Sequence, residues 1–262
     1  MLEFVEKLTL CPWLLVRSDV TRLRDVGFPD STTLHIILGS AHFNYLNRMA
    51  DGIGIRFEYK TTVPASSARS SQRFAQPFAT DSSVPTQASS PTSPTWIAFP
   101  ESDKPVADPE QPHNLYWLMS YNQEARDLAV EWRRFQLRET RQLGAPLRSQ
   151  LALYISGLNH CEYSAYWIRK NLESLGESRF LCDQLALGKV PQALPRRDRL
   201  LFAHAMRLTH EPTTTRVEHI QQLREVDMDD HAILQLTMLC SYFSFENRVA
   251  LALGVPIENR TS

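Results

Sequence analysis

A cysteine between a histidine and a glutamate is the group in this sequence best suited to chemistry. Cys161 follows His160 and precedes Glu162. A thiolate can attack a peroxide, and either neighbour could act as its base. Asn159 and Glu162 have the spacing of a capping pair, which predicts a helix with Cys161 in its first turn. The helix dipole would favour the thiolate and Glu162 would oppose it. A buried, inert cysteine remains the alternative.

The remaining cysteines and the paired histidines indicate structural roles. Cys11, Cys182 and Cys240 are widely spaced and form no C-x-x-C pair. Cys182 and Cys240 lie in apolar helical contexts typical of a core, whereas Cys11 could meet another thiol across the fold. His35 and His42 are seven residues apart, a spacing that favours packing over metal binding. We therefore expect no metal and no cofactor.

The charge pattern excludes several classes of partner. There are 28 basic and 29 acidic residues, and the net charge is -1. Arg133-Arg134 and the arginines at 196, 197 and 199 are interpreted as solvated helix faces, since the charge around them is balanced. No uncharged apolar run approaches the roughly 18 residues of a membrane span, and the N-terminus lacks a signal-peptide pattern. We expect a cytoplasmic protein without a nucleic-acid or membrane partner and without structural disulfides.

The helices that would position Cys161 belong to a sequence in which one segment is repeated 200 residues later. The residues shared by both copies, in the numbering of the first, are Leu8, Thr9, Pro12, Leu23, Arg24, Val26, Asp30, Leu34, Phe43, Asn47, Arg48, Ala50 and Gly54. A register without gaps indicates that both copies form the same supersecondary unit. Because the Asn-Arg pair occurs in both, it is interpreted as structural, through helix-end hydrogen bonds or a subunit contact.

Each copy predicts a short helix followed by a long one. In the first copy, Ser18 would cap a helix through Val26, and Gly27 (Asp227 in the second copy) would stop it in the left-handed region. The long helix would start at Asp30 or Ser31 and end at 52–54. Its expected buried faces are Leu34, Ile37, Leu38, Ala41, Tyr45 and Met49 in the first copy and Leu234, Met238, Ser241, Phe245 and Val249 in the second. Further helices are predicted at 122–143, 147–156, 160–175 and 195–208, and no alternating strand pattern occurs, so the fold class is all-α.

The composition also predicts how the chain is divided. Ala65 to Pro94 consists mainly of Ser, Thr, Pro, Ala and Gln, a composition that buries too little apolar area to offset its ordering entropy. We therefore expect a half-repeat at 1–58, a disordered linker at 59–112 and a complete module at 113–262.

At these motifs the chain resembles the alkylhydroperoxidase D-like, or carboxymuconolactone decarboxylase, superfamily, in its peroxidase-related branch. Ala152, Ser156, Asn159, Cys161 and Tyr163 match the first motif of that branch, and the shared repeat residues match the motifs that follow. The resemblance implies an all-α alkylhydroperoxidase D-like module, preceded here by a helical half-module on a flexible linker. It also implies a homo-oligomer, a hydroperoxide substrate and a thiol reductant.

The chemistry that the resemblance implies is reduction of hydroperoxides by two thiols, with a carboxylate and a histidine relaying the proton. In this sequence the carboxylate position falls on Ser149, the second cysteine on Ser164 and the histidine on Ile168. Only Cys161 is retained, so the two-thiol reaction cannot take place at this site. The expected function is weak or one-cysteine peroxidase activity at Cys161, with His160 or Glu162 as base. The alternative is a pseudoenzyme that keeps the scaffold for binding or assembly.

Overall fold

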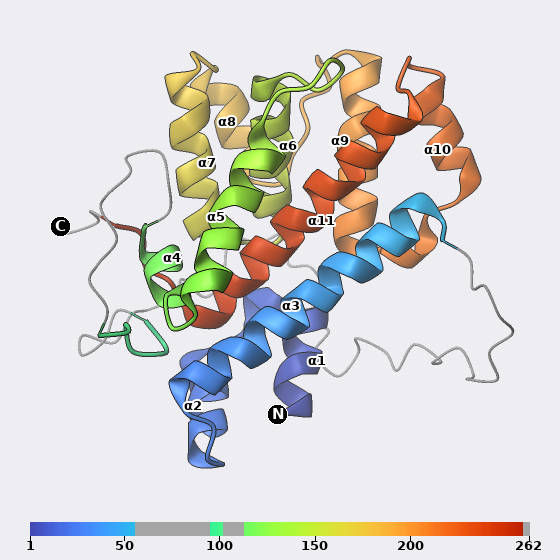
Figure 1. Ribbon diagram of the computed structural model, residues 1–262. Helices are drawn as coiled ribbons and strands as arrows, with labels where there is room; N and C mark the ends of the chain where they lie inside the picture. The colour runs from blue at the N-terminus through green and yellow to red at the C-terminus, as the bar shows by residue number, and fades with distance from the viewer. Residues whose placement is uncertain (56–94, 102–112, 259–262) are drawn as a thin grey trace, which may run out of the picture.

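The computed structural model describes residues 1–55, 95–101 and 113–258 (Figure 1), and these residues form helices and no strand. The helices are α1 (Leu2–Leu10), η1 (Pro12–Leu14), α2 (Arg17–Asp25), α3 (Asp30–Ile53), α4 (His113–Met119), α5 (Gln123–Leu137), α6 (Ala145–Leu158), α7 (Glu162–Ser174), α8 (Arg179–Ala186), α9 (Arg196–His210), η3 (Pro212–Thr214), α10 (Val217–Arg224) and α11 (Asp230–Leu253). The all-α prediction is confirmed, although α1, α4 and α8 had not been predicted. None of the described helices has the length and apolarity needed to cross a bilayer.

The elements of residues 1–54, here called the first segment, match those of residues 196–254, the second segment. η1, α2 and α3 have counterparts 200 residues later in η3, α10 and α11. Gly27 and Asp227 both adopt positive φ, as predicted for the turn between the short and long helices. Ser18 is not the cap of α2, however. The helix starts at Arg17, and the Asp19 carboxylate accepts the backbone N–H of Val16, because an acid at that position can reach back to the preceding turn.

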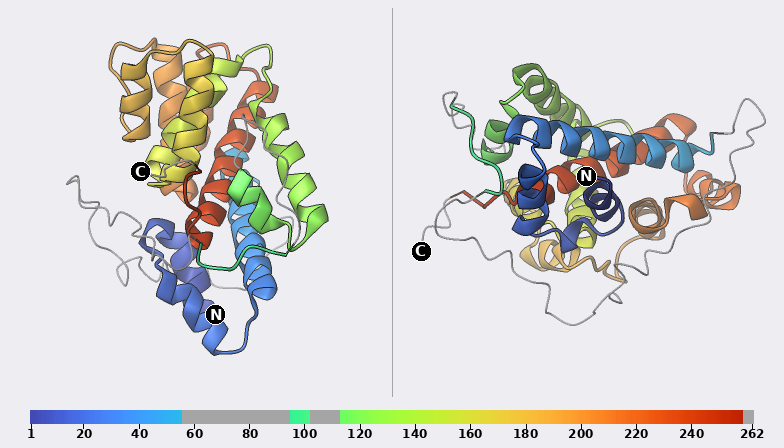
Figure 2. Two further views of the ribbon diagram at one scale, coloured as in Figure 1. Left: turned by 90° about the vertical axis from the view of Figure 1, so that its left-hand side faces the viewer. Right: turned by 90° about the horizontal axis from the view of Figure 1, so that it is seen from below.

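The long helices α3 and α11 lie side by side and run in opposite directions (Figures 1 and 2). On α3, Leu34, Ile37, Ala41 and Tyr45 are buried, while Leu38 and Met49 are half-buried. The predicted face of α3 therefore packs into the core. The single-face prediction for α11 is wrong, because the helix is covered by α3 on one side and by α5, α6, α7 and α9 on others. Every residue from Leu239 to Leu253 is buried.

Two arginines tie the segments together reciprocally. Arg48 donates to the carbonyl oxygen of Thr209 at 3.2 Å, and Arg248 donates to that of Thr9 at 3.0 Å. These carbonyls lie in the last turns of α9 and α1, where helix geometry leaves oxygens without intrahelical donors. Each guanidinium therefore caps a helix of the other segment, in line with the helix-end role predicted for the Asn-Arg pair.

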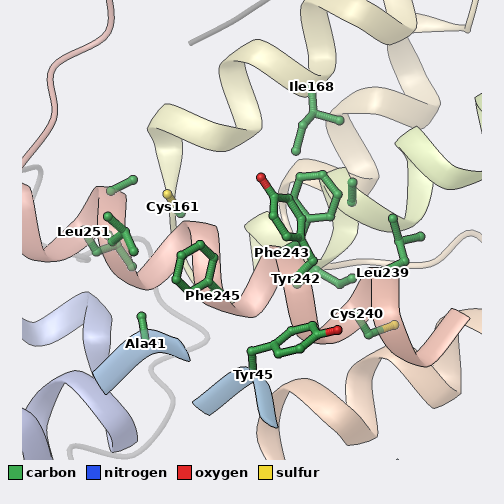
Figure 3. Close-up of a cluster of buried hydrophobic side chains, with 14 of the residues drawn as sticks. Ala41, Tyr45, Cys161, Ile168, Leu239, Cys240, Tyr242, Phe243, Phe245 and Leu251 are labelled. Carbon is green, nitrogen blue, oxygen red and sulfur yellow. The ribbon is translucent and has the colours of Figure 1, made fainter. Parts of the chain in front are cut away.

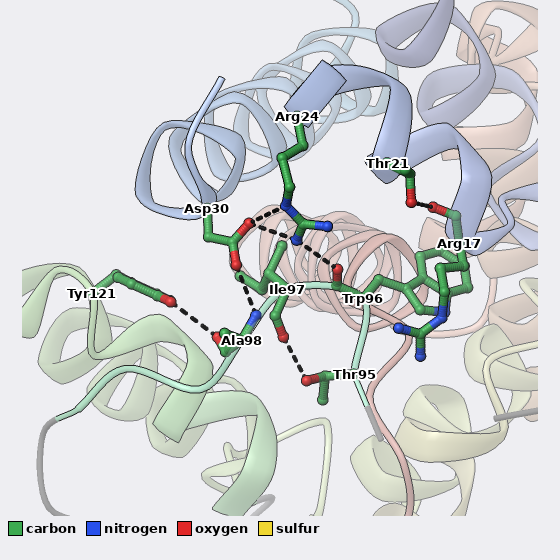
Figure 4. A network of polar contacts seen from close by, with 9 residues as sticks. All are labelled: Arg17, Thr21, Arg24, Asp30, Thr95, Trp96, Ile97, Ala98 and Tyr121. Atoms are coloured by element: carbon green, nitrogen blue, oxygen red, sulfur yellow. Dashed lines mark hydrogen bonds and ion pairs between the residues drawn. The ribbon is translucent and has the colours of Figure 1, made fainter. Parts of the chain in front are cut away.

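Residues 95–101 form a short strap over one end of the α3–α11 pair (Figure 4). The backbone N–H of Trp96 donates to Leu253 O at 2.9 Å, and that of Ala98 donates to the Asp30 carboxylate at 2.8 Å. Trp96 and Ile97 are buried. The expectation of an unpacked linker is therefore wrong at 95–101, because two large apolar side chains find a place in the core there. The remainder of 59–112 lies outside the described residues.

Candidate active site around Cys161

The loop between α6 and α7 places Cys161. The amide of Asn159 donates to Ile155 O at 2.9 Å within the last turn of α6, so Asn159 ends one helix and does not start the next. His160 has a left-handed φ of 51°, and Cys161 is the N-cap residue of α7. The predicted capping pair is therefore wrong, because α6 extends two residues beyond its expected end. Cys161 lies just before the first turn of α7 rather than within it.

The thiol of Cys161 is enclosed by protein (Figure 3). The residue is 1% exposed, and its Sγ lies 3.4 Å from the Ser164 hydroxyl oxygen. Burial raises the pKa of the thiol to about 11, the hydrogen bond with Ser164 opposes that rise, and the negative charge of Glu246 adds to it. At neutral pH the group is a protonated thiol.

Beyond Ser164 lies a buried ion pair that the sequence analysis did not identify. The Ser164 hydroxyl lies 3.4 Å from Glu246 Oε1, which also accepts from Arg133, and Tyr242 donates to Glu246 Oε2 at 2.9 Å. Glu246 and Arg133 are 1% and 4% exposed. Burial alone would lower the pKa of Arg133, but the Glu246 carboxylate outweighs it and the pKa is raised. The interpretation of Arg133 as a solvated residue is therefore wrong.

A signal for this pair was present in the sequence. Glu246 is the one Asp, Glu, Lys or Arg residue between Asp230 and Arg248, in a stretch otherwise suited to a core. The corresponding residue of the first copy is Leu46. A carboxylate in such a place needs a buried partner, and that need would have pointed to an arginine on a neighbouring helix.

The three positions at which the family residues are replaced are all buried. Ser149 lies on α6 and donates to Asn171 Oδ1 on α7 at 3.2 Å. Ile168 lies on α7 and is 1% exposed in the apolar cluster drawn in Figure 3. The Ser149 hydrogen bond therefore joins α6 to α7, while Ser164 on α7 contacts Glu246 on α11.

The Cys161 thiol is hydrogen-bonded to Ser164 rather than to either of its two candidate bases. The ring of His160 meets the Trp13 ring edge-on, with 5.8 Å between centroids, and burial lowers the pKa of His160. Glu162 is exposed. Within the described residues, the hydrogen bond of the Cys161 sulfur goes to Ser164. This geometry does not place either neighbour as a base for the thiol.

The other candidate histidines and cysteines have the contacts and burial of structural residues. His42 stacks on Tyr45, and His35 lies 3.5 Å from the Asn122 amide. Cys11, Cys182 and Cys240 are buried and free. In the described part of the chain, no three His, Cys, Asp or Glu side chains gather as metal ligands would.

Comparison with known proteins gives a match in structure only. No family model matches the chain, and no curated protein matches its sequence. A crystal structure of an uncharacterized peroxidase-related protein from Silicibacter sp. TM1040 is similar, with a TM-score of 0.57 and 20% identity, over 64% of this chain and 94% of that one. A second, described as an alkylhydroperoxidase core and an uncharacterized peroxidase-related protein from Ralstonia eutropha JMP134, gives a TM-score of 0.52 and 16% identity, over 56% and 77% of the two chains. The chain therefore has the all-α fold of the alkylhydroperoxidase core.

Proposed function

We propose that this protein is a pseudoenzyme, an alkylhydroperoxidase-type helical scaffold that serves binding or assembly and has lost dithiol peroxidase turnover. One observation carries the proposal. The buried sulfur of Cys161 is hydrogen-bonded to the hydroxyl of Ser164, and that hydroxyl in turn contacts Glu246 of the Arg133–Glu246 ion pair. A second thiol would have to occupy the position of Ser164.

The chemistry explains why this arrangement does not support turnover. In dithiol reduction, a thiolate attacks the peroxide O–O bond, giving a sulfenic acid and releasing an alcohol or water. The second thiolate then attacks that sulfur, forms the disulfide and releases water. Serine cannot close the disulfide. A thiol with a pKa of about 11 is also a thiolate in only about one molecule in ten thousand at neutral pH.

A one-cysteine peroxidase is the second candidate, and a specific contact favours it. The Ser164 hydroxyl lies 3.4 Å from both the Cys161 sulfur and Glu246 Oε1, a path by which a proton could leave the thiol. An external thiol would then have to reduce the sulfenic acid. The pairing of Glu246 with Arg133 and the 1% exposure of Cys161 favour the pseudoenzyme over this candidate.

The proposal extends to the organisation of the chain. Residues 113–262 are proposed to be one complete module, and residues 1–58 a repeated half-module that packs where a second module would stand. The matched helices of the two segments and the reciprocal capping by Arg48 and Arg248 support this division.

Peroxide turnover is the direct test. We expect the natural protein to consume little or no hydroperoxide with a dithiol reductant, and Cys161→Ala to behave identically. The combined change Ser149→Glu, Ser164→Cys and Ile168→His should raise turnover, because it restores the missing groups. Robust turnover by the natural protein that Cys161→Ala abolishes would replace the pseudoenzyme with the one-cysteine mechanism.

The pH dependence of Cys161 provides an independent check. Its folded pKa of about 11 lies above the ordinary value of 9.0, so the buried thiol favours the protonated form. The resulting stability is complete below pH 9.0 and is lost as pH rises toward about 11. Alkylation of Cys161, measured by mass spectrometry, should likewise rise steeply with pH up to about 11. An alkylation rate that is half-maximal near neutral pH would contradict this expectation. The Cys161→Ser variant is the control, because it measures alkylation of the other cysteines alone.

A further inference from the structure

The outer face of α3 carries an apolar stripe that is exposed over much of its length. Its residues are Ile36, Gly39, Phe43, Leu46, Ala50 and Ile53. Phe43 is 65% exposed, Leu46 and Ile53 are each 42% exposed, and Gly39 is exposed. Ile36 and Ala50 are half-buried, and Ile36 packs partly against the core. In Figures 1 and 2 this helix lies on the outside of the α3–α11 pair.

The same positions on α11 show what such a stripe normally does. They are Leu236, Leu239, Phe243, Glu246, Ala250 and Leu253, and all are buried. Helices α5, α6, α7 and α9 pack around α11. Phe43 and Phe243 are identical residues, yet one is 65% exposed and the other is 0% exposed. The first segment keeps a surface built to receive a helix, and no described helix covers it.

The spacing of the stripe identifies the kind of helix that fits. The intervals from Ile36 to Ile53 are three, four, three, four and three residues, which is the a/d pattern of a coiled-coil seam. When two copies of this seam run antiparallel about a two-fold axis between residues 44 and 45, each a position faces a d position. Phe43 then meets Leu46, Gly39 meets Ala50, and Ile36 meets Ile53. Large side chains sit next to the axis, and the small pair allows close approach of the backbones.

The charges on α3 also suit a second copy. Over the length of the seam the charged residues are Arg48, which is buried, and Asp51, and neither flanks it directly. The flanking positions are His35, Ser40, His42, Asn47, Met49 and Gly54, and none of them is Asp, Glu, Lys or Arg. A two-fold axis brings like residues together, so charged flanking positions would repel one another. Their absence removes that obstacle to self-association and gives no charge pattern for an acidic or basic partner.

We infer that the α3 stripe is a homodimer interface, in which two copies of this chain pair their α3 helices antiparallel about a two-fold axis near residues 44 and 45. This inference names the surface for the assembly role proposed above and rests on that role. It is independent of the thiol chemistry. The seam is about 26 Å long and by itself smaller than the roughly 800 Å² per partner of a standard interface. The pairing is therefore concentration-dependent.

Sedimentation of the full chain over a wide range of concentration tests the pairing. We expect a monomer–dimer equilibrium that Phe43→Glu abolishes, with an unchanged thermal midpoint of the monomer because Phe43 is exposed. Phe180→Glu is the matched control, since Phe180 is 68% exposed on α8, and it should leave the equilibrium unchanged. A monomer at every concentration would overturn the inference and leave the stripe to a different protein. A dimer that survives Phe43→Glu would also overturn it.

Cross-linking then tests the register. Leu46→Cys should form a disulfide between identical chains, because the two positions lie within about 5 Å of one another along the axis. Gly39→Cys should not cross-link to itself, since the offset is roughly 16 Å, but it should cross-link when mixed with Ala50→Cys. Self-linking by Gly39→Cys would indicate parallel helices and contradict the proposed geometry. The natural cysteines are buried and contribute little background.

Discussion

The Arg133–Glu246 pair changes what the site around Cys161 is able to do. A buried charge is tolerated only when it is paired and hydrogen-bonded, and here each ion has the other, with Tyr242 donating to the carboxylate in addition. Burial raises the pKa of Cys161 and the carboxylate adds to that rise, so both oppose the thiolate that a peroxidase needs. At the residue scale, the network favours a packed core over a reactive one.

The energetics of this pair can be tested by comparing a variant that breaks it with one that replaces both partners. Glu246→Gln should destabilise the protein by about 3–5 kcal/mol, because it leaves the Arg133 guanidinium buried without a counter-charge. Changing both residues, Arg133→Met with Glu246→Leu, should recover most of that loss, since an apolar pair no longer requires solvation. Urea unfolding gives both values. If Glu246→Gln costs less than about 0.5 kcal/mol, the ion pair is not formed in solution.

The sequence predicted only part of this site. Cys161 was found because a cysteine in a motif is visible locally. The replacement residues Ser149, Ser164 and Ile168 are buried, and the Ser164 hydroxyl oxygen lies 3.4 Å from the Cys161 sulfur. Glu246 follows Cys161 by 85 positions in the sequence, and no local pattern joins the two. The capping pair at Asn159 failed for a related reason, because the length of α6 is set by its packing rather than by its cap.

Helices α3 and α11 show how elements of matched sequence acquire different surroundings. Both contain 24 residues and both end at a glycine in the left-handed region, at Gly54 and Gly254. Periodicity and turn residues were enough to predict these ends. They could not predict that α11 is buried on all sides from Leu239 onward, because that depends on the helices stacked around it.

The two C-terminal glycines form a matched test at the scale of the element. Both have positive φ, so alanine should cost roughly 1–2 kcal/mol at either site. At Gly54 nothing lies within 4 Å of the added Cβ, whereas at Gly254 the Cβ would overlap the Trp96 ring. We therefore expect Gly254→Ala to cost about 1–3 kcal/mol more than Gly54→Ala. Equal thermal shifts for the two variants would mean that the strap at 95–101 is not seated on α11.

Across the whole molecule, close contact between the segments depends on Gly52. A Cβ at this position would meet the Thr237 methyl and the Leu208 side chain, but a Cβ at Gly39 on the same helix meets nothing within 4 Å. We expect Gly52→Ala to destabilise the chain by about 1–3 kcal/mol and Gly39→Ala to stabilise it by about 0.5–1 kcal/mol. Calorimetry of the two variants checks both signs. Stabilisation by Gly52→Ala would show that α3 and α11 are less closely packed.

The overall architecture was partly predictable. A repeat at a spacing of 200 residues indicated two equivalent helix groups, and the structure places their long helices against one another. Which residues join the groups could not be read from periodicity, because Arg48 and Arg248 reach backbone carbonyls that carry no sequence signal. The strap was missed since its apolar residues, Trp96 and Ile97, lie in a region whose composition otherwise indicates disorder.

The pairing of α3 with α11 has a consequence for how the protein is made. The two helices start 200 residues apart, and a ribosome adding about 5–20 residues per second needs roughly 10–40 s to cover that distance. Throughout that interval the apolar face of α3, with Leu34, Ile37 and Ala41, lacks α11, the helix that covers it most extensively, and only α1 and α2 of the first segment are available to pack on α3. The nascent chain therefore exposes part of the apolar face of α3 until α11 has been synthesised. Chaperone binding to the early chain is the expected means of preventing its aggregation.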